Sequence, residues 1–174
     1  MAGGDAQGAV SITGMEQIRL RTMTAAEFED WRSRAVAGLA AERVRAGHWD
    51  AEHAETRAAQ ETDSLLPDGP GTPKMLLLMA ETPSGDPLGL VWIGLDRPRP
   101  GCAWLYEIEI NPEHQGEGYG RALLQAAEQE SARRGVSKLG LNVFGGNTVA
   151  RHLYESSGYQ ITAMNMRKDL QGPE

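Results

Sequence analysis

Three glycines occupy alternate positions, Gly116, Gly118 and Gly120, just before a segment with the composition of a helix. Glycine lacks a Cβ, so it allows positive φ angles and lets a ligand approach the main chain closely. The first turn of a helix also offers N–H groups without intrahelical acceptors, at the positive end of the helix dipole. Glycines at the start of a helix therefore indicate a site for an anion, most often a phosphate.

Two common phosphate motifs do not fit this segment. No Gly-Lys-Ser/Thr follows the glycines, so the segment is not the phosphate loop of the NTPases. The dinucleotide fingerprint would need a glycine at position 121, where Arg121 stands. The pattern that remains is Gln115-x-x-Gly118-x-Gly120. On the glycines alone, a plain turn between a strand and a helix is the other interpretation.

Two acidic side chains, Glu107 and Glu109, precede the glycines in a run that reads as a strand, residues 103–110. In a regular strand they would point to the same face, whereas a bulge between them would break that parity. The alternative to a role in chemistry is that one or both face solvent or bind an arginine.

The elements that must position these groups follow from periodicity and punctuation. Thr24 and Glu27 form a capping box pattern, which predicts the start of a helix, and Gly47 is a stop signal that predicts its end. The predicted elements are strand 18–21, helices 25–47 and 49–65, strands 74–80, 88–95 and 103–110, helix 118–134, strand 139–143, helix 148–157 and strand 160–167. The order β-αα-βββ-α-β-α-β predicts an α/β fold with a mixed sheet flanked by helices.

Length and charge narrow the classes of function. A chain of 174 residues with 40% hydrophobic residues is expected to form one globular domain, which we place at residues 15–174 after a Gly/Ala-rich leader, residues 1–14. The net charge of −7 without a basic patch argues against nucleic acid, and no run of ~20 apolar residues argues for a membrane span. A lone cysteine, Cys102, suits a reducing cytoplasm. Its spacing from the histidines matches no metal site.

Two segments together resemble the Gcn5-related N-acetyltransferase (GNAT) superfamily. The first is Gln115-x-x-Gly118-x-Gly120 behind the strand Tyr106-Glu-Ile-Glu-Ile110, which is similar to the family's acetyl-coenzyme A motif. The second is Asn147-x-x-Ala150-x-x-Leu153-Tyr154-Glu155-x-x-Gly158-Tyr159. The resemblance covers roughly residues 16–169, and the front half looks like a bacterial subgroup. It implies a mostly antiparallel sheet and transfer of an acetyl group from acetyl-CoA to a primary amine, with no metal.

The resemblance also implies which residues hold the cosubstrate. The coenzyme's pyrophosphate would lie on the main chain of the glycine turn, and its pantetheine arm would pair with the preceding strand like an added β-strand. The implied contacts are Gln115, Gly116, Glu117, Gly118, Tyr119, Gly120 and Arg121 for the phosphates, and Ile108, Glu109, Ile110 and Asn147 for the pantetheine. The strand 139–143 is expected to splay away from the cofactor strand. For Asn147, a role at the start of the following helix is the alternative.

The family usually supplies a tyrosine as the general acid, matched here by Tyr154. Glu107 is our first candidate for the general base and Glu109 the second. Some relatives that acetylate protein N-termini carry a glutamate at the position of Asn142, and an amide cannot take that proton. The acceptor is expected to be a small-molecule or peptide amine, and a homodimer is common in the family. The alternative class is a non-catalytic acyl-CoA-binding module.

Overall fold

A computed structural model describes residues 18–166 and residue 168 of the chain. The chain divides into two compact units, of which the larger ends at Asn142 and the smaller begins at Val143. The predicted leader, residues 1–14, lies outside the described residues. The assignment of a single domain from residue 15 stays a prediction.

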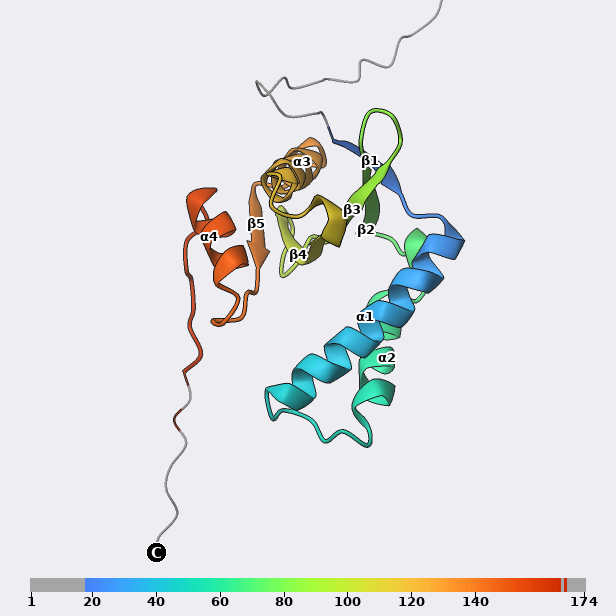
Figure 1. Ribbon diagram of the computed structural model, residues 1–174, viewed down its shortest axis with the longest axis vertical. Helices are drawn as coiled ribbons and strands as arrows, with labels where there is room; N and C mark the ends of the chain where they lie inside the picture. Colours follow the sequence, from blue (N-terminus) through green and yellow to red (C-terminus); the bar gives the residue numbers. More distant parts are fainter. Residues whose placement is uncertain (1–17, 167, 169–174) are drawn as a thin grey trace, which may run out of the picture. The chain divides into compact units, whose positions relative to one another are not determined.

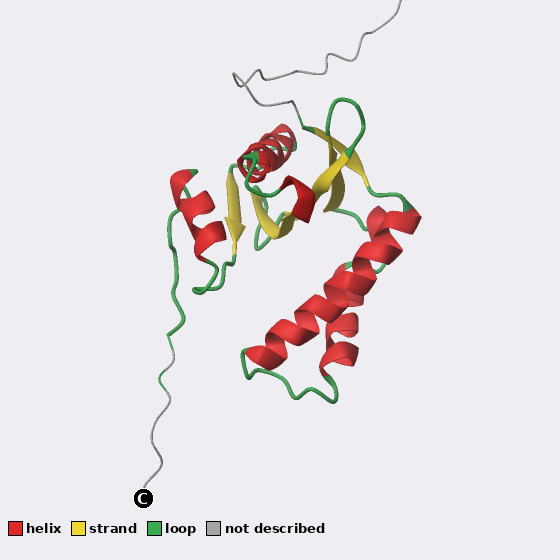
Figure 2. Cartoon of the chain, in the orientation of Figure 1, coloured by secondary structure: helices red, strands yellow, loops and turns green. Residues whose placement is uncertain are grey.

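The larger unit is built on a five-stranded sheet in which the strands follow their order in the sequence (Figures 1 and 2). The first four strands pair antiparallel, and the last pairs parallel to its neighbour. The strands are β1 (Arg19–Thr22), β2 (Met75–Glu81), β3 (Pro87–Leu95), β4 (Cys102–Ile110) and β5 (Lys138–Leu141). The prediction of a mixed, mostly antiparallel sheet flanked by helices is confirmed.

Three α-helices belong to this unit: α1 (Ala25–Arg45), α2 (Ala54–Leu65) and α3 (Tyr119–Arg133). Helix α1 begins with the predicted capping box, because the Glu27 N–H donates to the Thr24 hydroxyl and the Thr24 N–H donates to the Glu27 carboxylate. Helix α2 begins later than the predicted position 49. Asp50 accepts a hydrogen bond from the His53 N–H at 3.0 Å, which favours a turn over a helix before Ala54.

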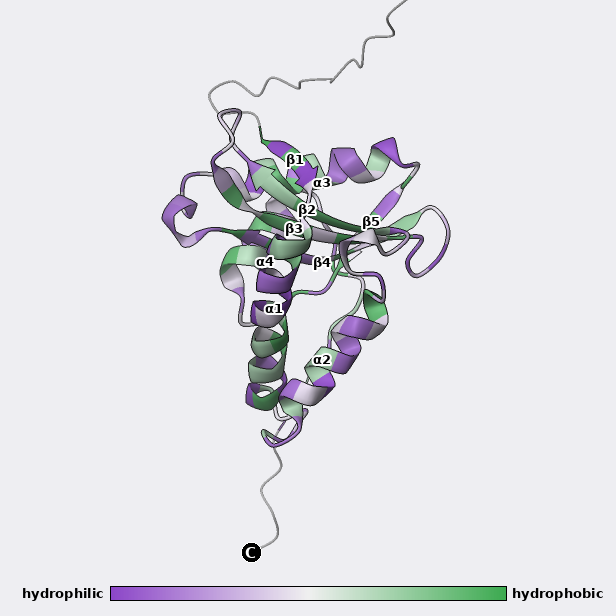
Figure 3. Cartoon of the chain, turned by 90° about the vertical axis from the view of Figure 1, so that its right-hand side faces the viewer, coloured by the Kyte–Doolittle hydropathy of each residue, from purple (hydrophilic) through white to green (hydrophobic). Residues whose placement is uncertain are grey.

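Side chains are buried on both faces of β3, which therefore lies at the centre of the core. Figure 3 shows the hydrophobic colour of the central strands. Leu90 and Trp92 face α1 and pack in a cluster with buried residues of α1 and β2, namely Phe28, Trp31, Met75 and Leu77. The alternate residues Val91 and Ile93 lie on the opposite face, where α3 packs on β3 and β4. A strand buried on both faces gives the sheet a rigid centre on which a site can be built.

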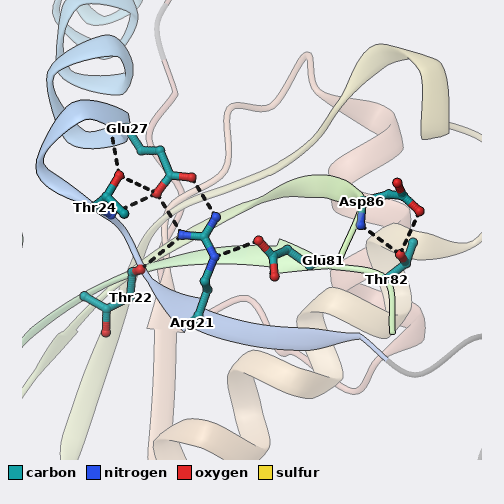
Figure 4. A network of polar contacts seen from close by, with 7 residues as sticks. All are labelled: Arg21, Thr22, Thr24, Glu27, Glu81, Thr82 and Asp86. Atoms are coloured by element: carbon teal, nitrogen blue, oxygen red, sulfur yellow. Dashed lines mark hydrogen bonds and ion pairs between the residues drawn. The ribbon is translucent and has the colours of Figure 1, made fainter. Parts of the chain in front are cut away.

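A polar network ties the start of α1 to the sheet edge (Figure 4). The Arg21 guanidinium of β1 donates to both Glu27 carboxylate oxygens, at 2.8 and 2.7 Å, and to Glu81 of β2 at 2.6 Å. These bonds from Arg21, with smaller contributions from Thr24, lower the pKa of Glu27 to about 2. The network therefore carries a charged carboxylate at all ordinary pH values.

The smaller unit contains helix α4 (Thr148–Ser156). The strand predicted for residues 160–167 is not found among its described residues. Residues 160–166 are exposed and have no regular secondary structure, and Arg167 lies outside the described residues. A strand depends on a paired neighbour and a buried face, and these residues have neither within the part of the chain that the structure describes.

Candidate active site

A β-bulge in β4 sets the direction of the two acidic side chains. Trp92 of β3 lies opposite Glu107, but the next residue, Ile93, lies opposite Leu105, so Tyr106 is the extra residue. A bulge of this kind places two consecutive side chains on one face. The Tyr106 ring accordingly stacks on Trp92, with ring centroids 4.4 Å apart, while Glu107 faces α1 as well.

Glu107 and Glu109 share the face of the sheet that α1 covers. Both lie beyond the bulge, so the parity that the sequence predicts for them is kept. The indole N–H of Trp31 donates to Glu107 Oε2 at 3.0 Å, across 76 residues of sequence. The Glu109 carboxylate lies 3.7 Å from the Arg34 guanidinium and is 37% exposed, which matches the alternative of binding an arginine.

Burial raises the pKa of Glu107, and the negative charge of Glu109 raises it further. The hydrogen bond from Trp31 and the positive charge of Arg34 act in the opposite direction. A carboxyl group with a raised pKa in a partly buried position is a better proton acceptor than one in water. The sequence did not predict the contacts of Trp31 and Arg34 with these acids. Their spacing indicates only that the two lie on one face of a helix, and not which strand that face covers.

Within the described residues, the main chain of β4 has no strand partner beyond Leu105 on the side away from β3. Strand β5 pairs with β4 only from Cys102 to Leu105, and β5 ends at Leu141. In an antiparallel pair, main-chain groups alternate between facing the partner strand and facing away. The Ile110 carbonyl faces away, because it accepts a hydrogen bond from Gln115 Nε2 at 2.9 Å. By the same alternation, the main-chain groups of Ile108 face the open side.

A glycine in β3 confirms this alternation. A Cβ at Gly89 would lie 2.0 Å from the Glu109 carbonyl oxygen, so that oxygen points at β3. Only glycine fits so close to a neighbouring main chain. Strand β5 leaves β4 unpaired beyond Leu105, in the segment where the resemblance implies that strand 139–143 splays away from the cofactor strand.

The glycine turn provides main-chain donors next to this open edge. Gly116 and Gly118 have φ angles of +81° and +91°, and α3 begins at Tyr119. Within the described residues, the N–H groups of residues 116–120 donate no hydrogen bond to the protein. The Arg121 N–H differs from the prediction, because it donates to the Gly118 carbonyl at 3.1 Å. The set of free donors therefore ends at Gly120, and it suits an anion.

The Gln115 side chain, which is predicted to contact the cosubstrate, has a partner within the protein. Its amide is bound to the Ile110 carbonyl, which ties the turn to the end of β4. This bond holds the first free N–H groups close to the open strand edge. Gln115 thus supports the arrangement of the turn, whether or not it also contacts a ligand.

The smaller unit carries the remaining two candidates. Tyr154 of α4 is 9% exposed, its ring lies 5.6 Å from that of Tyr159, and burial raises the pKa of its hydroxyl. Asn147 is the N-cap of α4, since its side-chain oxygen accepts from the Ala150 N–H at 3.1 Å. The cap uses only the oxygen, so the two amide N–H donors of Asn147 are not consumed by it.

The described residues contain no group of three or more histidine, cysteine, aspartate or glutamate side chains arranged to hold a metal ion. None of the helices in residues 18–166 is both long and apolar enough to cross a membrane.

The fold and this site agree with one family. The model of the acetyltransferase (GNAT) family matches residues 28–159, so the chain belongs to this family and is an acetyltransferase. It is 34% identical over 154 residues to an uncharacterized N-acetyltransferase, YycN, of Bacillus subtilis, which covers 88% of this chain and 99% of YycN. The crystal structure of YycN matches with a TM-score of 0.82 at 33% identity, over 89% of this chain and 99% of that one.

A further relative extends the comparison. The mycothiol acetyltransferase of Beutenbergia cavernae is 30% identical over 168 residues, which are 94% of this chain and 52% of that protein. The relatives thus share the acetyltransferase assignment.

Proposed function

We propose that this protein transfers an acetyl group from acetyl-CoA to a primary amine by direct attack of the amine on the thioester. The observation that carries the proposal is the junction of the β4 edge, open at Ile108 and at the Ile110 N–H, with the free N–H groups of residues 116–120. A pantetheine arm, which carries two amides, can pair with an open strand edge, and a pyrophosphate needs several donors. The two features adjoin at the end of β4, which supports the proposal.

Glu107 is the general base in this proposal, with Glu109 as the second candidate. Burial raises the pKa of Glu107, which makes it a stronger proton acceptor, and it lies two residues along β4 from Glu109. Glu109 is more exposed and already has the Arg34 guanidinium as a partner. Deprotonation of the amine as it attacks leaves a neutral amide product.

Tyr154 is the general acid that protonates the leaving thiolate. A phenol has an ordinary pKa of about 10 and keeps its proton at neutral pH, as an acid must, and burial raises the pKa of the Tyr154 hydroxyl further. Its place in the second motif supports this role. Asn147 would use its amide N–H donors for the pantetheine arm while its oxygen caps α4.

The acceptor belongs to the primary amines of small molecules or peptides. The net charge of −7 favours a cationic amine over an anionic one. Asn142 lacks the carboxylate that some enzymes acting on protein N-termini carry, so we place such N-termini lower in the order. A cytoplasmic protein, either monomer or homodimer, is consistent with this chemistry.

The test is an acetyl-transfer assay with acetyl-CoA and a panel of amines. The panel comprises an aliphatic polyamine, an amino-acid amide, a lysine-containing peptide, a peptide with a free α-amino group and an aminoglycoside. Release of the free thiol and mass spectrometry of the amine report the reaction. Acetylation of one panel member above the rate without enzyme supports the proposal. Binding of acetyl-CoA without transfer to any of them would favour the acyl-CoA-binding module.

A further inference from the structure

The indole of Trp31 is held in place more firmly than its hydrogen bond alone requires. Trp31 is 1% exposed, and its ring contacts Phe28 at 5.6 Å and Trp92 at 5.4 Å between centroids. Trp92 is in turn stacked on Tyr106, the bulge residue next to Glu107. The aromatic cluster therefore fixes the direction of the Trp31 N–H, which is aimed at Glu107 Oε2.

The chemistry of the acceptor in this hydrogen bond is informative. A buried indole N–H is stabilised by an acceptor, and the neutral amide of a glutamine at position 107 would serve as one. A carboxylate in the same place costs more free energy, because a charged group loses more solvation on burial than a neutral one. An acid kept at a buried position in spite of that cost points to use of its proton affinity.

We propose that Trp31 is a positioning residue for Glu107: its fixed indole N–H holds Oε2 and leaves the other carboxylate oxygen, in the charged form, to meet the acceptor amine. This inference rests on Glu107 acting as the base of the proposed reaction. Trp31 itself touches neither the amine nor the thioester in this scheme.

The other groups that face Glu107 have opposite signs and partly offset each other. Glu109 comes from β4 and Arg34 comes from α1, and the two lie 3.7 Å apart. The residue opposite Glu107 on β3 is Trp92, which carries no charge. Among these groups, Trp31 makes the hydrogen bond to the carboxylate, so its removal has the most direct effect on the proton affinity of Glu107.

The experiment compares Trp31→Phe with Trp92→Phe. The first substitution keeps an aromatic ring and removes the N–H donor. The second removes an equally buried indole from the same cluster, whose N–H has no partner within the described residues. The Glu107 carboxyl carbon is followed by NMR titration of ligand-free protein, and the pH dependence of kcat/KM is measured with acetyl-CoA and the amine that reacts fastest in the panel.

We expect Trp31→Phe to raise the pKa of Glu107 and to move the acidic limb of the kcat/KM profile to higher pH. Trp92→Phe should change the pKa of Glu107 and the position of the acidic limb less than Trp31→Phe does. At neutral pH, kcat should fall about 10–100-fold in Trp31→Phe through loss of orientation, with little change in KM for acetyl-CoA. In wild-type protein, the Trp31 indole N–H resonance should titrate together with Glu107, which tests the contact without any substitution.

Two outcomes would overturn the inference, and they can be told apart. If Glu107→Gln removes the acidic limb but Trp31→Phe moves neither the limb nor the carboxyl titration, Trp31 has no positioning role and the proposed reaction stands. If Glu107→Gln is fully active, the base assignment is wrong and the role of Trp31 fails with it. In that second case the NMR titration would still report whether the two groups are coupled.

Discussion

At the scale of single residues, the proposed reaction depends on side chains whose surroundings shift their proton affinity. Burial raises the pKa of both Glu107 and Tyr154. For Glu107 as the proposed base this favours accepting a proton, and for Tyr154 as the proposed acid it favours keeping one until the leaving group departs. The two shifts have a common cause, but they would suit opposite roles in the reaction that we propose.

Replacing Glu107 should separate activity from stability. Because the pKa of Glu107 is higher in the folded protein, the folded state binds more protons than the unfolded state between the two pKa values, and stability falls as pH rises through that range. Glu107→Gln should therefore unfold at higher urea concentration at neutral pH. The difference should vanish below about pH 4.3, where the unfolded carboxyl is also protonated.

The same variant should lose roughly 10²–10⁴-fold in kcat. Glu109→Gln is the matched control on the same strand, and its effect on kcat should be smaller. A Glu107→Gln variant that is less stable than wild type at neutral pH would show that the carboxylate stabilises the fold. A larger loss of kcat in Glu109→Gln would reverse our order of bases.

Tyr154→Phe should lower kcat by roughly 10–100-fold, at or just below the bottom of the usual range for acid–base assistance. The leaving group is a thiolate, whose thiol has a pKa of about 8.5, so it departs without help at a substantial rate. Acetyl-CoA affinity, measured by calorimetry, should change little because the ring remains. Tyr159→Phe, on the neighbouring ring, is the control. Full activity of Tyr154→Phe would leave this tyrosine a packing residue.

At the scale of elements, the junction between the end of β4 and the start of α3 positions the proposed cosubstrate site. Strand β4 ends its pairing with β5 at Leu105, so its outer edge stays open as far as Ile110. The chain then turns through two glycines with positive φ into α3, which presents its free N–H groups beside that edge. A strand edge and a helix start, each incomplete in its hydrogen bonds within the described residues, together form the site that we propose for the amides and phosphates of acetyl-CoA.

Gly120→Val should abolish acetyl-CoA binding and leave the fold largely intact. Gly120 lies inside α3 and has no positive φ, so a valine does not strain the main chain there, but its branched side chain would crowd the donors. Gly38→Val is the control, since a Cβ at this glycine of α1 would meet nothing within 4 Å. Calorimetry measures the affinity and circular dichroism the fold. Unchanged affinity in folded Gly120→Val would exclude the turn as the phosphate site.

Gly118 is a poorer position for this test, although the sequence alone makes the two glycines equivalent. Its φ of +91° is a conformation that a β-branched residue adopts only under strain. Gly118→Val would therefore combine a loss of stability with any loss of binding.

At the scale of the whole molecule, stability at low pH depends on the network that joins β1, β2 and α1. Arg21 lowers the pKa of Glu27 to about 2, so Glu27 contributes stability above the pKa of the unfolded chain. That contribution is lost as pH falls through about 2. Glu107 has the opposite dependence, and its effect on stability lies at higher pH.

Arg21→Met should lower the free energy of unfolding by about 1 kcal/mol at neutral pH, since the pairs are partly exposed. The difference from wild type should shrink as pH falls from about 4.5 towards about 2. Urea denaturation at several pH values measures it. Arg19 lies on the same strand and has no ion pair in the described part of the chain, so Arg19→Met should change the free energy of unfolding little. Equal losses in the two variants would mean that the network adds nothing specific.

The sequence alone determined the features that depend on neighbours along the chain. The capping box at Thr24 and Glu27, the pairing of β2 with β3 and the helix after the glycines all follow from local spacing. Two motifs at the expected separation also predicted the family, which the comparison confirmed. Such patterns can be read because a helix or a hairpin imposes its own period on the residues that form it.

The tertiary structure decided what depends on pairing between distant segments. The bulge at Tyr106 exists only through the register of β3 against β4, and the bond from Trp31 to Glu107 joins residues 76 positions apart. The predicted strand 160–167 is missing from the described residues. A local sequence pattern can favour an extended chain, but it does not supply the neighbouring strand with which that chain must pair. Burial, and with it the raised pKa of Glu107, arises only when α1 covers β4. Side-chain desolvation is a property of the packed fold, and no local pattern of residues contains it.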